Sequence, residues 1–81
     1  MMLFNYINVN IIRIKADIKL GLIPCSLLRH WEIYGRYDVS KKMGDPETLA
    51  RFEACEKYRI SESTICRIIK KMESQVESIN N

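Results

Sequence analysis

Residues 58–71 have the sequence YRISESTICRIIKK and contain the clearest periodic pattern of the chain. Ser61 is a favourable N-cap for a helix, and Glu62 suits the positive end of the helix dipole. Beyond this start, apolar residues recur at the spacing of one helical face: Ile65, Ile68, Ile69 and Met72. The stretch therefore predicts an amphipathic helix that begins near Ser61.

The opposite side of this predicted helix is polar and basic. On a wheel of ~100° per residue, the residues there are Ser63, Arg67, Lys70 and Ser74, with Thr64 and Lys71 on one flank. Hydroxyls and capped N-terminal amides can bind phosphates, and a guanidinium such as that of Arg67 can pair with a guanine edge. Lys70 and Lys71 would neutralise backbone charge, so this face suits a helix that lies in a groove of DNA.

Residues 54–70, ACEKYRISESTICRIIK, resemble the helix-turn-helix of resolvases, transposases and small regulators of phages and mobile elements. Five positions carry the resemblance: Cys55 as the small residue of the first helix, Ile60 in the turn, Ser61 as the cap, and Ile65 and Ile68 as buried residues. The resemblance implies a DNA-facing set of Ser61, Glu62, Ser63, Cys66, Arg67 and Lys70. Arg59 departs from the glycine that is common in the turn, and a positive φ would cost it roughly 1 kcal/mol or more.

The 81 residues predict a single all-α domain, since 47% are hydrophobic and only three glycines and two prolines interrupt the chain. Asp45 and Pro46 favour a helix start, so the helix-turn-helix is expected over residues 46–72. An earlier helix is expected over 24–37, with Leu27, Trp31, Tyr34 and Tyr37 on its apolar face, followed by a loop over 38–45. Aromatic residues at this spacing indicate core positions. His30, at the edge of that face, is expected to be a hydrogen-bonded packing residue.

The N-terminal segment, residues 6–20, has two interpretations. Ile12–Leu20 alternates apolar and charged residues as a strand does, but isoleucines also recur at helical spacing. We favour a helix ended by Gly21, because nothing later in the chain resembles a partner strand. The alternative is a ribbon strand that pairs with its copy in a dimer and places Arg13, Lys15 and Lys19 near a major groove.

Residues 73–81 are expected to be a helix extension or a frayed tail. Val76 and Ile79 continue the apolar stripe beyond Met72, and such a stripe needs a cover. Two covers are available: the isoleucine-rich N-terminal segment of the same chain, or a second protomer. Because pairing would double the phosphate contacts, we expect a homodimer formed by residues 4–20 and 72–79.

The net charge of +3 is mildly basic and compatible with a polyanionic partner. No carboxylate pair, Ser/His/Asp set or glycine-rich phosphate loop indicates an enzyme or a cofactor. Cys25, Cys55, Cys66 and His30 lack the paired spacing of a metal site. The odd number of cysteines, with no signal peptide or membrane span, indicates a cytoplasmic protein.

These features together predict sequence-specific binding of double-stranded DNA by a small transcriptional regulator of a phage or mobile element. The alternative, from a different class, is a protein–protein interaction module on which the basic helix face is incidental.

Overall fold

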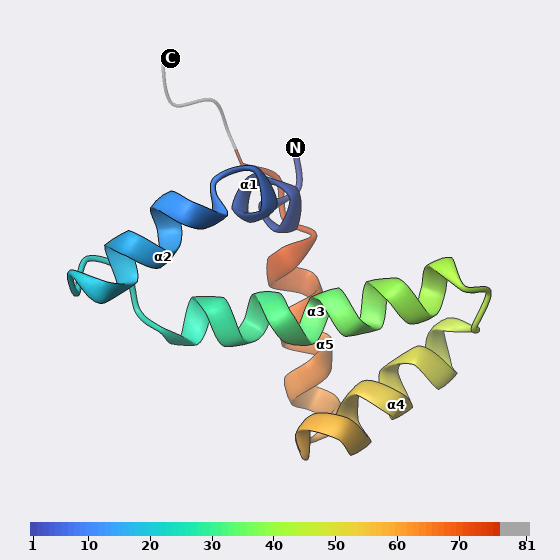
Figure 1. Cartoon of the computed structure of the whole chain (residues 1–81). Helices are drawn as coiled ribbons and strands as arrows, with labels where there is room; N and C mark the ends of the chain where they lie inside the picture. The colour runs from blue at the N-terminus through green and yellow to red at the C-terminus, as the bar shows by residue number, and fades with distance from the viewer. Residues whose placement is uncertain (77–81) are drawn as a thin grey trace.

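The computed structural model describes residues 1–76 and shows an all-α domain (Figure 1). Five helices follow one another with no strand among the described residues: α1 (Leu3–Val9), α2 (Ile11–Lys19), α3 (Ser26–Lys42), α4 (Glu47–Tyr58) and α5 (Glu62–Met72). The predicted fold class is therefore confirmed. Among these residues, no helix has the length and apolar character needed to cross a membrane.

The long helix α3 is the centre of the domain. It crosses α5, and it packs against α1, α4 and α5 (Figure 1). Buried side chains from all five helices form one core cluster: Ile7, Ile14, Ile33, Tyr34, Tyr37, Ala50, Ala54, Ile65, Ile68 and Met72. Tyr34 and Tyr37 thus have the core role predicted from their spacing, and Leu27 and Trp31 pack beside them, half-buried.

The predicted loop over residues 38–45 is wrong in its first half, because α3 continues to Lys42. Ser40 lies on the buried side of this extra turn, and Lys42 forms a 3.0 Å ion pair with Asp38. Lysines in the last turn also suit the negative end of the helix dipole. The chain leaves the helix at Gly44, whose φ of +100° is readily available only to glycine.

The N-terminal segment is helical, so the strand alternative for Ile12–Leu20 is wrong. The single helix expected over 6–20 is, however, two helices that meet at Asn10. The backbone of Asn10 leaves the helical region, and its side-chain amide donates a 2.9 Å hydrogen bond to the carbonyl oxygen of Tyr6. As expected, a glycine follows the end of α2, and Gly21 has a φ of +79°.

The chain leaves the helical path after Met72, so a helix extension is wrong for residues 73–76. Instead, these residues lie beside the N-terminus of the same chain. The Leu3 amide donates a 2.8 Å hydrogen bond to the carbonyl oxygen of Ser74, and the Val76 amide donates one of 2.8 Å to that of Met1. The N-terminal segment is thus one of the two covers expected for this region. Ile79 lies outside the described residues, and the homodimer stays a prediction.

A side-chain contact joins α3 to the residue that directly follows α5. The Tyr34 hydroxyl, on α3, donates a 2.9 Å hydrogen bond to the carboxylate of Glu73, directly after α5. Burial, followed by this hydrogen bond, raises the pKa of Tyr34. The contact holds the C-terminal end of α5 against the central helix.

Replacing Ile68 with alanine should lower the free energy of unfolding by about 2–5 kcal/mol, because its buried side chain would leave a cavity. Ile68 is only 3% exposed, whereas Ile12 is 84% exposed. Ile12→Ala is therefore the matched control and should change stability by less than about 0.5 kcal/mol. Chemical denaturation of the two variants measures the difference, and equal midpoints would contradict the packing of α5.

Candidate nucleic-acid interface

The turn between α4 and α5 has a left-handed residue at its start. Arg59 follows the end of α4 with φ 54° and ψ 51°, the positive φ that glycine would accommodate at this position. The amide of Ile60 donates a 3.2 Å hydrogen bond to the carbonyl oxygen of Cys55, which satisfies one of the last acceptors of α4. This turn sets the direction in which the chain enters α5.

Ser61 caps α5, as predicted. Its hydroxyl oxygen accepts a 3.2 Å hydrogen bond from the Thr64 amide, and its Oγ lies 2.9 Å from the Thr64 hydroxyl and 3.1 Å from the Ser63 hydroxyl. Three hydroxyls therefore meet at the positive end of the helix dipole. Such a cluster, with the exposed first-turn amides, is suited to bind an anion.

The apolar side of α5 is fixed against the rest of the domain. Ile65 and Met72 are fully buried, with Ile68 nearly so. Cys55, expected to be the small residue that α4 packs against α5, is half-buried, while its neighbour Ala54 is fully buried. The helix α4 packs against α5, and burial, followed by Glu62 and Cys66 of α5, raises the pKa of the Cys55 thiol.

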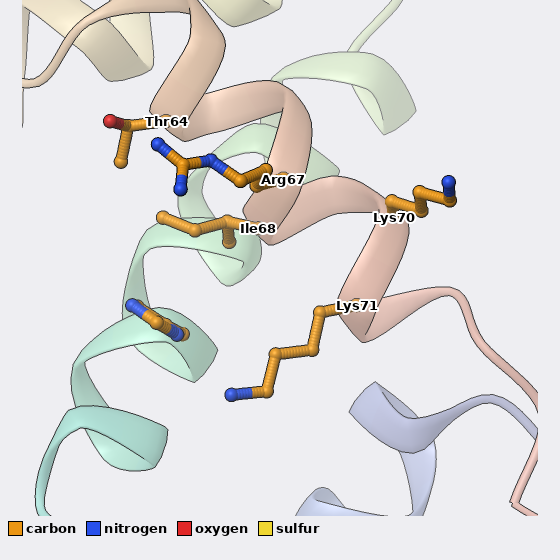
Figure 2. Close-up of a pocket in the computed structure, with 6 residues that line it drawn as sticks. Thr64, Arg67, Ile68, Lys70 and Lys71 are labelled. Atoms are coloured by element: carbon orange, nitrogen blue, oxygen red, sulfur yellow. The ribbon is translucent and has the colours of Figure 1, made fainter.

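The eight residues predicted to face DNA come together on α5 and its cap. Seven are exposed and Thr64 is half-buried; the set is Ser61, Glu62, Ser63, Thr64, Cys66, Arg67, Lys70 and Lys71. They do not all point the same way. Figure 2 shows Thr64 and Arg67 extending from α5 on one side and Lys70 extending on the other.

The three cations of this surface, Arg67, Lys70 and Lys71, are exposed. Among residues 1–76, no carboxylate forms an ion pair with Arg67, Lys70 or Lys71. Glu62 differs from them, because its carboxylate lies 3.8 Å from the guanidinium of Arg51 on α4. Glu62 therefore has an interaction within the domain, and its negative charge does not favour contact with a phosphate.

His30 of α3 belongs to the same surface, which the sequence pattern did not reveal. An open groove of about 480 Å³ lies between α3 and α5, and it is lined by His30, Thr64, Arg67, Ile68, Lys70 and Lys71 (Figure 2). Burial, Lys71 and Arg29, in that order, lower the pKa of His30. We expected His30 to be hydrogen-bonded, and this is wrong for its Nδ1 atom. This atom is buried and forms no hydrogen bond with any residue within 1–76.

The described residues include no cluster of three histidine, cysteine or acidic side chains placed to hold a metal ion. Comparisons of the chain with protein-family models, with curated proteins and with solved structures find no match. The chemistry of the surface itself is therefore the basis for assigning a function.

Replacing Arg59 with glycine should raise the free energy of unfolding by about 0.5–1 kcal/mol. The left-handed conformation costs a non-glycine residue about 1–2 kcal/mol, and the greater unfolded-state freedom of glycine offsets part of the gain. Gly44→Ala is the reverse control, because Gly44 also has a positive φ, with open space around it. Thermal or chemical unfolding should show the two substitutions shifting stability in opposite directions; a loss of stability in Arg59→Gly would contradict this account of the turn.

Proposed function

We propose that the chain binds double-stranded DNA in a sequence-specific manner, with α4, the turn and α5 acting as a helix-turn-helix. One observation carries the proposal. The isoleucine side of α5 is buried, and three cations without an ion-pair partner among residues 1–76 are exposed on the rest of the same helix: Arg67, Lys70 and Lys71. A purely structural helix would need the buried side but not this set of cations.

Each part of the surface has a distinct task in this proposal. The hydroxyls of Ser61 and Ser63 and the first amides of α5 contact a backbone phosphate at the positive end of the helix. Arg67, which is exposed in the middle of α5, contacts a base edge in the major groove, where bidentate pairing with guanine gives specificity. Lys70 and Lys71 contact phosphates and contribute affinity without sequence preference.

The biological setting we propose is a small transcriptional regulator of a phage or mobile element. This part rests on the resemblance of residues 54–70. The competing proposal is a protein–protein interaction module. Salt distinguishes the two, because DNA binding through phosphates weakens steeply as salt rises. An interaction module would show no such response with any DNA.

We also propose that two copies bind together, so that two α5 helices contact successive half-sites. The exposed apolar residues Val9 and Ile12 lie in the N-terminal region expected to form the dimer. Sedimentation at micromolar protein, alone and with DNA, tests this. A monomer under both conditions would contradict pairing while leaving DNA binding intact.

The direct test of DNA binding begins with selection of bound sequences from a random pool. On the selected site, Arg67→Ala should lower affinity by about 1–3 kcal/mol and relax base preference at one position. Lys70→Ala should instead weaken binding to all sequences alike and reduce the salt slope by about one.

Lys42→Ala is the control for these variants, since Lys42 is an exposed cation at the end of α3, outside both α5 and residues 4–20. It removes the same charge and should change affinity far less than Arg67→Ala. Failure to select any sequence would overturn the proposal. Equal losses in all three variants would mean that overall charge, rather than the surface of α5, determines binding.

A further inference from the structure

The groove between α3 and α5 joins two helices that the sequence alone does not place together. His30 and Thr64 line it with Ile68 at its base and the cations of α5 around it. In Figure 2, Arg67 extends from α5 on the groove side, and Lys71 extends toward the neighbouring helix. The result is an open, positively charged recess beside the face assigned to DNA.

The charged groups that act on His30 are cations, and none of them comes from α4, which also packs against α3. Lys71 acts on it from α5 and Arg29 from its own helix, while Arg67 and Lys70 complete the charged lining of the groove. The helix α1, which also packs against α3, has no charged residue. No carboxylate within residues 1–76 is among the groups that shift the pKa of His30.

We propose that this groove binds a backbone phosphate of the DNA and that His30 takes up a proton when the phosphate enters. The inference rests on the proposed function and adds a second point of attachment, from α3, to the contacts made by α5. Because Nδ1 is the buried ring nitrogen, the proton is taken up at Nε2, and the new Nε2–H donates to the phosphate oxygen. The ammonium of Lys71, which lies beside His30, neutralises part of the remaining phosphate charge.

The direction of the pH effect follows from these charges. In the free protein, burial and the two nearby cations lower the pKa of His30, so the ring is neutral near pH 7. A bound phosphate would place a negative charge beside His30. This charge raises the pKa of the ring and favours its protonated form. Binding is then coupled to the uptake of a proton, and affinity for DNA increases as the pH falls from about 7 to about 5.5, by about threefold to tenfold.

His30 is the only histidine in the chain, which makes the test specific. Nuclear magnetic resonance titration of the intact protein, with and without the selected duplex, should show a higher His30 pKa in the complex. His30→Gln should remove the pH dependence of affinity between about pH 5.5 and 7 and change affinity at about pH 7.5 by less than about twofold. Lys71→Gln should raise the His30 pKa in the free protein, because it removes a nearby cation.

The outcomes separate this inference from the function on which it rests. Binding of DNA with an unchanged His30 pKa would overturn the phosphate subsite alone. Retention of the full pH dependence in a folded His30→Gln variant would do the same. Absence of DNA binding at every pH would overturn the proposed function as well. If His30→Gln fails to fold, the titration of the unmodified protein still decides the question.

Discussion

The burial of one side of α5 fixes how this helix packs against α3 and α4. Ile65, Ile68 and Met72 belong to the same core as the aromatic side chains of α3 and the alanines of α4. Once these three side chains are buried, α5 cannot rotate about its axis. Arg67 and Lys70, on other sides of the helix, must then face outward, so the packing of the core determines the surface presented to a partner.

The same burial explains how the domain tolerates a turn without glycine. Burying a large aliphatic side chain contributes about 1.5–3 kcal/mol, and three such side chains anchor α5. The left-handed backbone of Arg59 costs about 1–2 kcal/mol, a small part of that gain. The Ser61 cap and the hydrogen bond from Ile60 to Cys55 further offset the cost at the two ends of the turn.

The sequence predicted the features that depend on local periodicity and capping, namely the all-α class, the start of α5 at Ser61 and its buried isoleucines. It did not predict the last turn of α3, because the polar segment around Asp38 resembles a loop until Ser40 is seen to be buried. The end of α5 at Met72 depends on pairing with the N-terminus, more than 70 residues away in the chain. The position of His30 beside α5 depends likewise on how α3 crosses α5, which no local pattern encodes.

We propose that DNA contacts the exposed side of α5 rather than another basic part of the domain. Amide chemical-shift mapping of the labelled protein, titrated with a selected duplex, measures this most directly. We expect the largest changes in residues 61–71 and around His30. Little change is expected in α2, which carries three cations of its own: Arg13, Lys15 and Lys19. Changes concentrated in α2, or no changes at a salt concentration that permits binding, would contradict this proposal.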